Sequence, residues 1–199
     1  MAPVVAVYIL WFIWVLTWIA ATQWLHPKGK HAHIGLEVVY RVLAVGGFLL
    51  LMGVQPVPRY DLDDWFWRPL DGTAGWWLFL VTLAGFVLAW WARIQLGRVW
   101  SDTLNKSHDH HVIQTGPYAV VRQPVYTGII ISSFATAAIF GLPWRLFGAV
   151  VMSAGFVIKA LLEEQFLREE LAEAYDDYAK RVPLLVPFWP QKIWPSQHA

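Results

Sequence analysis

The fold is decided by residues 126–162, which read YTGIIISSFATAAIFGLPWRLFGAVVMSAGFVIKALL. Two apolar runs, Tyr126–Leu142 and Trp144–Leu162, meet at Gly141-Leu142-Pro143. A helix rises about 1.5 Å per residue, so about 20 apolar residues cross the hydrocarbon core of a bilayer. The pattern therefore predicts a tight hairpin of two membrane helices. The first helix is short and rich in Ser, Thr, Ala and Gly, which favours close packing against other helices.

Three further apolar spans precede this hairpin: Val4–Leu25, Ile34–Val54 and Gly75–Leu96. The first span lacks the basic start and small-residue cleavage site of a signal peptide, so a membrane helix is the better interpretation. Glu37 and Arg41 are four residues apart in the second span and are predicted to pair. We expect an all-α polytopic bundle of five transmembrane helices in a single domain, 1–199. Residues 1–95 would hold three helices and 96–199 the hairpin with its flanking segments.

The composition agrees with a membrane protein. Hydrophobic residues make up 57% of the chain and charged residues 15%, against about 25% charged in typical soluble domains. The net charge of +1 offers no field for a polyanion, which argues against a nucleic-acid partner. The chain has no cysteine, so a disulfide, a thiolate metal site and a catalytic thiol are excluded.

The distribution of basic residues predicts an orientation. With five spans, the segments 26–33, 97–125 and 163–199 share one side and carry nine Lys and Arg, against three on the other. By the positive-inside rule, the C-terminus is expected in the cytoplasm and the N-terminus outside. The prediction is a multi-pass protein, of the inner membrane if its source is prokaryotic.

Two polar segments on the predicted cytoplasmic side could carry chemistry. The first runs from Leu96 to Gly128 and the second continues the last helix beyond Leu162. In that helix Lys159 and Glu163, and likewise Glu164 and Arg168, are spaced for pairing, although a solvated charged face would look the same.

Neither segment shows a common catalytic motif. His108, His110 and His111 lack the spacing of a closed metal site, and we predict no metal. Glu163 and Glu164 are about 100° apart around a helix, so we expect them to face different surroundings and not to share a proton. No nucleophile triad, P-loop or dinucleotide fingerprint is present.

The ordered motifs resemble those of the isoprenylcysteine carboxyl methyltransferase family, from Leu96 to Pro187. The family pattern LGxxWS, GxYxxxRHPxYxG, a membrane hairpin, EExxL and YxxYxxxVPxxxP is matched at most positions. The matching residues are Gly116, Tyr118, Arg122, Pro124, Tyr126, Gly128, Glu163, Glu164, Leu167, Tyr175, Tyr178, Val182, Pro183 and Pro187.

The resemblance implies an integral membrane methyltransferase that uses S-adenosyl-L-methionine. Its cofactor pocket would be cytoplasmic and formed by the loop before the hairpin and the C-terminal helix and tail. The acceptor would be a lipophilic or lipidated molecule, such as a prenylcysteine carboxylate, arriving from the bilayer. Lys159 falls where the family has an arginine linked to substrate handling, and Glu164 and Arg122 are the candidate catalytic residues. The implied cofactor contacts are Thr103, His110, His111, Val112, Ile113, Gly116, Tyr118, Gln123, Pro124, Val125, Tyr126 and Glu163.

Two departures from the family pattern keep alternatives open. Gln123 replaces the family histidine and cannot carry a titrating proton. Lys159 replaces an arginine and so loses a planar, bidentate clamp for a carboxylate. The alternatives are an NADPH-dependent reductase of the sterol-reductase type and a non-catalytic membrane protein that retains the scaffold. The sequence identifies neither the acceptor atom nor the oligomeric state.

Overall fold

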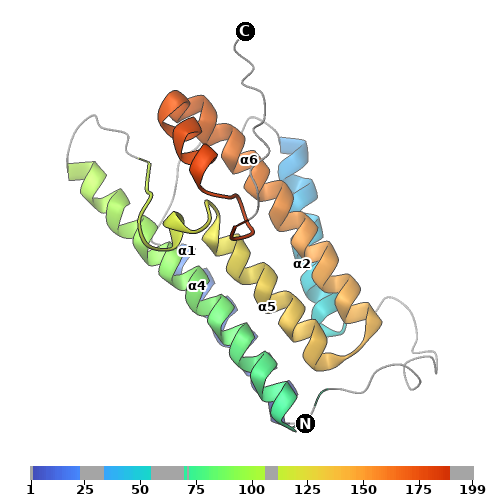
Figure 1. Cartoon of the computed structure of the whole chain (residues 1–199). Helices are drawn as coiled ribbons and strands as arrows, with labels where there is room; N and C mark the ends of the chain where they lie inside the picture. The colour runs from blue at the N-terminus through green and yellow to red at the C-terminus, as the bar shows by residue number, and fades with distance from the viewer. Residues whose placement is uncertain (1, 23–33, 55–69, 71, 106–111, 189–199) are drawn as a thin grey trace. The chain divides into compact units, whose positions relative to one another are not determined.

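The computed structural model describes residues 2–22, 34–54, 70, 72–105 and 112–188, and the side chains at 98–105, 170 and 172–174 are not described. Every regular element in these ranges is helical, which confirms the all-α prediction (Figure 1). The elements are α1 (Ala2–Thr22), α2 (Ile34–Met52), α4 (Gly72–Asn105), the short 3₁₀ helix η1 (Gly116–Ala119), α5 (Pro124–Phe140) and α6 (Pro143–Arg181).

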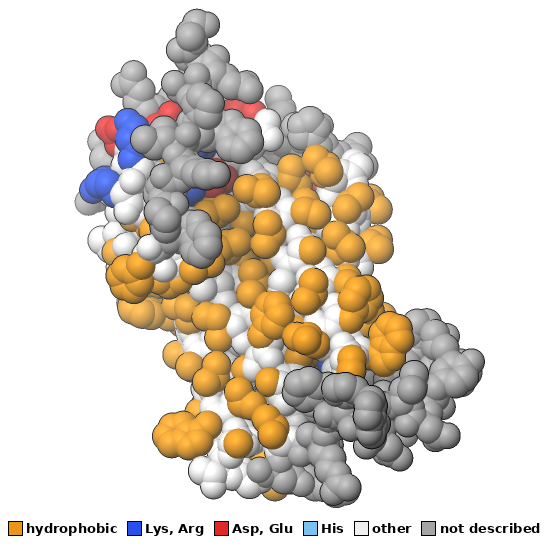
Figure 2. All heavy atoms as spheres, turned by 45° about the vertical axis from the view of Figure 1, so that its right-hand side comes forward, with side chains coloured by type: hydrophobic (Ala, Val, Ile, Leu, Met, Phe, Trp, Pro, Cys, Tyr) orange, Lys and Arg blue, Asp and Glu red, His pale blue; other side chains and the backbone are white. Residues whose placement is uncertain are grey.

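Four of the described helices are long and apolar enough to cross a membrane. Their spanning stretches are Ala2–Ala21, Gly35–Met52, Gly72–Gly97 and Pro143–Glu169. The α5 helix is apolar but has only 17 residues, so the predicted count of five spans is not confirmed by length. Exposed apolar side chains cover much of the surface in Figure 2, as expected for helices that face lipid.

The end of α4 differs from the sequence-based prediction, whereas the end of α6 agrees with it. The α4 helix continues to Asn105, so the predicted start of a loop at residue 97 is wrong. Its sequence contains no proline, and a single Gly97 is tolerated inside a helix. The predicted continuation of the last helix beyond Leu162 is confirmed, because α6 reaches Arg181. The predicted hairpin is also confirmed, since Gly141 has a φ of 67° between α5 and α6.

The chain divides into two compact units. The first comprises Met1–Val87 and Gly128–Lys159, and the second comprises Leu88–Thr127 and Ala160–Ala199. In the first unit, small and polar residues hold the helices together. The Trp11 indole donates to Thr136 Oγ1 at 2.9 Å, and Ser132 donates to the Thr82 carbonyl at 2.9 Å. Small hydroxyl side chains that allow such contacts are typical of helix packing in lipid.

Close approach of α2 and α6 sets the position of Lys159. A Cβ atom on Gly155 would lie 2.8 Å from the Ala44 nitrogen and 2.9 Å from the Tyr40 oxygen, so only glycine fits. One turn later, the Lys159 ammonium lies 5.3 Å from the centre of the Tyr40 ring, within the range of a cation–π contact. The predicted Glu37–Arg41 pair is confirmed at 3.0 Å on the same helix α2.

Candidate functional site

The second unit contains the segment before α5, which turns at Gly116. This glycine has a φ of 62°, in the left-handed region that other residues rarely adopt, and it opens η1. Two contacts tie the turn to α4. The Gln95 amide donates to Thr115 Oγ1 at 3.0 Å, and the Tyr118 hydroxyl donates to the Ala92 carbonyl at 3.3 Å. Residues 92–95 of α4 therefore lie directly against the turn.

A tyrosine and a carboxylate meet at the start of α5. Tyr126 is buried, and its hydroxyl donates to Glu163 Oε1 at 2.6 Å. Pro124 at the first position of α5 suits a helix start, because its missing N–H would lack an intrahelical partner there. The pair joins α5 to α6 and leaves a half-buried carboxylate beside an aromatic ring. Such a combination suits a cationic ligand.

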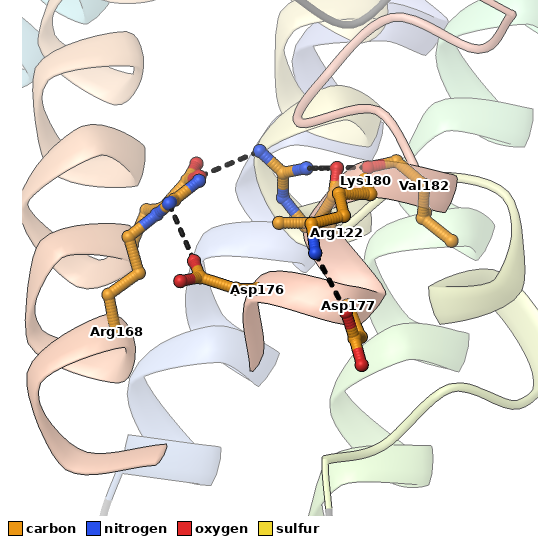
Figure 3. A network of polar contacts seen from close by, with 8 residues as sticks. Arg122, Arg168, Asp176, Asp177, Lys180 and Val182 are labelled. Carbon is orange, nitrogen blue, oxygen red and sulfur yellow. Dashed lines mark hydrogen bonds and ion pairs between the residues drawn. The ribbon is translucent and has the colours of Figure 1, made fainter. Parts of the chain in front are cut away.

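Arg122 is the centre of a buried polar network (Figure 3). Its side chain is 5% exposed, and Nη2 forms an ion pair with Glu164 Oε1 at 2.8 Å. Nη1 donates to the Ala179 carbonyl at 2.7 Å and to the Val182 carbonyl at 2.6 Å. Glu164 Oε1 also accepts from Arg168, whose Nη1 reaches Asp176 at 2.7 Å.

These contacts require α6 to turn back on itself. Glu164 and Ala179 are 15 residues apart, and a straight helix would separate them by about 22 Å. One guanidinium nevertheless touches both residues. The salt bridge between Arg168 and Asp176, eight residues apart, spans the same bend. Figure 1 shows the red C-terminal part of α6 folded back beside its orange part.

The segment after α6 pairs with the segment before α5. The backbone nitrogens of Arg122 and Gln123 donate to the carbonyls of Pro183 and Leu184 at 2.8 Å and 3.0 Å. Thr127 Oγ1 donates to the Leu185 carbonyl at 2.7 Å. The two segments are more than 55 residues apart in sequence, so the C-terminal segment is an integral part of the second unit.

Two buried tyrosines lie beside this network. The Tyr178 hydroxyl donates to the Tyr118 carbonyl at 2.6 Å, and Tyr175 packs edge-on against Tyr178. Val112, Leu167, Leu171 and Val182 pack around them. Burial, and secondarily the charge of Glu164, raises the pKa of Tyr175 to about 12. Burial also raises the pKa of Tyr178 and of Tyr118 well above the ordinary tyrosine value.

Most predicted site residues come together in this unit. Val112 lies in the tyrosine cluster, Ile113 is half-buried beside it in sequence, and Val125 is half-buried at the start of α5. His110 and His111 lie outside the described residues, as does the side chain of Thr103. Lys159 belongs to the first unit.

The expected divergence of the two neighbouring carboxylates is confirmed. Glu163 accepts from Tyr126, whereas Glu164 faces Arg122 and Arg168. The sequence did not reveal the carbonyl oxygens of Ala179, Val182 and the following residues as partners. Backbone acceptors leave no residue-type signal, and only the bend in α6 brings them to Arg122.

The described part of the chain is a bundle of helices, four of which are long and apolar enough to cross a membrane, as expected of a multi-pass membrane protein. Residues 77–171 match the model of the "Isoprenylcysteine carboxyl methyltransferase (ICMT) family", which confirms the resemblance seen in the motifs. This match includes Gly116, Arg122, Tyr126 and both carboxylates, and it ends before the C-terminal segment.

Curated relatives carry the names of methyltransferases. Protein-S-isoprenylcysteine O-methyltransferase B of Arabidopsis thaliana is 31% identical over 120 residues, which is 57% of this chain and 61% of the relative. The Schizosaccharomyces pombe protein-S-isoprenylcysteine O-methyltransferase is 29% identical over 50% of this chain and 43% of its own. Methanethiol S-methyltransferase 2 of Bradyrhizobium diazoefficiens is 34% identical over 35% of this chain and 26% of its own. The matches thus span between about a quarter and three fifths of these relatives.

Proposed function

We propose that this protein is an S-adenosyl-L-methionine-dependent methyltransferase acting on a lipophilic or lipidated acceptor at the membrane–cytoplasm interface. The observation that carries the proposal is the Tyr126–Glu163 pair at 2.6 Å, built on the motif stretch that the family match covers. The names of the relatives support either a prenylcysteine carboxylate or a small thiol as the acceptor.

The residues present suit a cationic cofactor. Glu163 is half-buried and accepts a hydrogen bond from Tyr126, while Tyr118 contributes a second aromatic ring to the same unit. When bound, S-adenosyl-L-methionine supplies a methyl group already activated on a sulfonium. The protein then mainly has to orient the two reactants and exclude water. The remaining candidate cofactor contacts are His110, His111, Val112, Ile113, Gly116, Gln123, Pro124 and Val125, together with Thr103.

Arg122 and Glu164 were the candidate catalytic residues, and we propose that they instead position the site. Arg122 donates to Glu164 and to two carbonyls, and Glu164 Oε1 accepts from two arginines. Because Glu164 is already engaged by the Arg122 and Arg168 side chains, we assign it a structural contact and no proton transfer. A carboxylate acceptor needs no general base. A protein in which Glu164 transfers no proton is therefore compatible with O-methylation.

The proposed topology places α5 as a short fifth span, with the N-terminus outside and the C-terminus in the cytoplasm. Nine Lys and Arg on the cytoplasmic segments against three on the others support this orientation. The second unit, with Tyr126 and Glu163, would then face the cytoplasmic boundary. Lys159 stays the proposed residue for contact with an anionic group of the acceptor.

The test is calorimetric titration of the detergent-purified full chain with S-adenosylhomocysteine, with NADPH in parallel. Saturable binding of S-adenosylhomocysteine at micromolar strength, about 8 kcal/mol, is expected. Transfer of labelled methyl groups to N-acetyl-S-farnesylcysteine and to methanethiol would then identify the acceptor class. Selective NADPH binding would indicate a reductase, and folded protein that binds neither would indicate a non-catalytic scaffold.

A further inference from the structure

The segment that follows α6 ends in an apolar tip that the candidate site does not use. Val186 is 54% exposed and Phe188 is 95% exposed, so both side chains face outward from the protein. Phe188 also has a φ of 60°, in the left-handed region that aromatic residues rarely adopt. Its side chain is almost fully exposed, so packing within the chain does not offset the cost of this backbone conformation.

Hydrogen bonds place this tip beside the start of α5. The Gln123 backbone nitrogen donates to the Leu184 carbonyl at 3.0 Å, and Thr127 Oγ1 donates to the Leu185 carbonyl at 2.7 Å. Donors and acceptors advance in the same direction along the chain, so the segment runs alongside the first turn of α5. Figure 1 shows the red end of the described chain beside the yellow start of this helix.

Two further contacts within the second unit give the depth of this turn relative to the membrane spans. The Tyr126 hydroxyl donates to Glu163 of α6, and the Tyr118 hydroxyl donates to the Ala92 carbonyl of α4. Both acceptors lie inside the candidate spanning stretches, within about two helical turns of their ends. Leu185 is bonded to the residue after Tyr126, so the tip lies at the level where these two spans end.

The composition of the segment suits contact with lipid. Residues 182–188 read VPLLVPF and carry no charge, whereas charged side chains are costly at membrane depth. The carbonyls of Pro183, Leu184 and Leu185 already accept hydrogen bonds inside the unit. Backbone groups that are paired in this way can approach hydrocarbon without losing a hydrogen bond to water.

We propose that Val186 and Phe188 insert into the membrane interface beside the first turn of α5. The bilayer is then the partner of this tip and supplies the apolar contacts that Phe188 does not find within the chain. Exposed aromatic and aliphatic side chains at this level are typical interfacial anchors. The same anchor would keep the segment against Arg122 and Gln123, which its carbonyls contact. The proposal concerns the bilayer alone and does not depend on the cofactor or the reaction.

The absence of cysteine allows a direct test with single labels. Phe188→Cys and Val186→Cys are each labelled with a nitroxide in the full chain and placed in phosphatidylcholine nanodiscs. Power saturation in electron paramagnetic resonance then measures collisions with oxygen and with a water-soluble nickel chelate. Ile94→Cys, at a 49% exposed position inside the α4 span, calibrates lipid contact. Asp177→Cys calibrates contact with water, because the Asp177 side chain is 71% exposed and pairs with Lys180.

Both tip labels are expected about 5–10 Å below the lipid phosphates, with more oxygen than nickel collisions, as for the label on α4. The label at position 177 should show the reverse. A second pair of variants tests the anchor itself. Adding Phe188→Ser to Val186→Cys should move the label at position 186 toward water, whereas adding Lys180→Ser should leave its depth unchanged.

Two results would overturn the proposal. An excess of nickel over oxygen collisions at both tip positions would place the tip in water. Low collision rates with both reagents would mean that protein covers the tip. Dipolar broadening of the singly labelled protein would then identify a second copy as the cover, and its absence would indicate another part of the same chain. If Phe188→Cys loses its helical circular dichroism, the label at position 186 decides.

Discussion

Replacing Glu164 by alanine should destabilise the protein far more than replacing its neighbour Glu163. The change removes the acidic partner of Arg122, whose side chain is only 5% exposed. Breaking a buried ion pair by deleting one partner costs about 3–5 kcal/mol, because the other charge remains buried. Arg122 keeps two carbonyl acceptors at 2.6 Å and 2.7 Å, so a loss of about 3 kcal/mol is expected.

Glu163→Ala removes the acceptor of the hydrogen bond that the Tyr126 hydroxyl donates, from a half-buried position. That loss is expected to cost about 1 kcal/mol of stability. The same substitution should lower the affinity for S-adenosylhomocysteine by more than this, because Glu163 is the carboxylate that we assign to the cationic cofactor. The two variants should therefore show opposite patterns, with Glu164→Ala losing mainly stability and Glu163→Ala losing mainly affinity for S-adenosylhomocysteine.

The assay is equilibrium unfolding in mixed dodecylmaltoside and SDS micelles, followed by calorimetric titration of each folded variant. Lys180→Ala provides the control, because Lys180 and Asp177 form an exposed pair that should contribute nothing measurable. The reasoning would be refuted if Glu164→Ala unfolded within 1 kcal/mol of the wild type. It would also be refuted if the two carboxylate variants lost stability and affinity in the same proportion.

Three further outcomes follow from contacts described above. Gly155→Ala should destabilise by about 1–3 kcal/mol in the same unfolding assay because its methyl would meet the α2 backbone, whereas Gly35→Ala meets nothing within 4 Å and should be neutral or stabilising. A chain that stops after Arg181 loses the carbonyls of Val182 to Leu185 and should keep its helical circular dichroism while losing S-adenosylhomocysteine binding in calorimetry. The folded pKa of Tyr175, about 12, lies above its unfolded value of about 10, so its contribution is complete below pH 10 and is lost as the pH rises through 12. Unfolding between pH 9 and 12 should therefore show a smaller decline in stability for Tyr175→Phe than for the wild type, and an identical decline would contradict the raised pKa.

The helices were predictable because lipid imposes a simple condition on sequence. A run of about 20 apolar residues satisfies its backbone internally only as a helix, so α1, α2 and the hairpin follow from hydropathy. Gly141 and Pro143 indicate the turn because glycine adopts a positive φ easily and proline favours the first position of a helix. The extension of α4 to Asn105 was missed because the continuous apolar run ends at Leu96, and the residues after it mix polar and apolar side chains.

The sequence named several residues that the structure brings together in the second unit, but it predicted only part of their contacts. The motif residues Gly116, Tyr126 and Glu163 were identified, and the divergence of Glu163 from Glu164 followed from helical geometry. The contacts of Arg122 were not predicted, because its carbonyl partners reach it only through the bend in α6.

The bend in α6 has a consequence for the order in which the protein is made. Residues 179–185 leave the ribosome after every helix of the first unit, yet their carbonyls complete the surroundings of Arg122. A nascent chain can therefore insert its helices into the bilayer before its second unit is closed. Until that last segment is synthesised, the carbonyls of Ala179 and Val182 are missing from Arg122, while Glu164 is already part of the chain. Membrane insertion and the gain of ligand binding should thus be separate events in time.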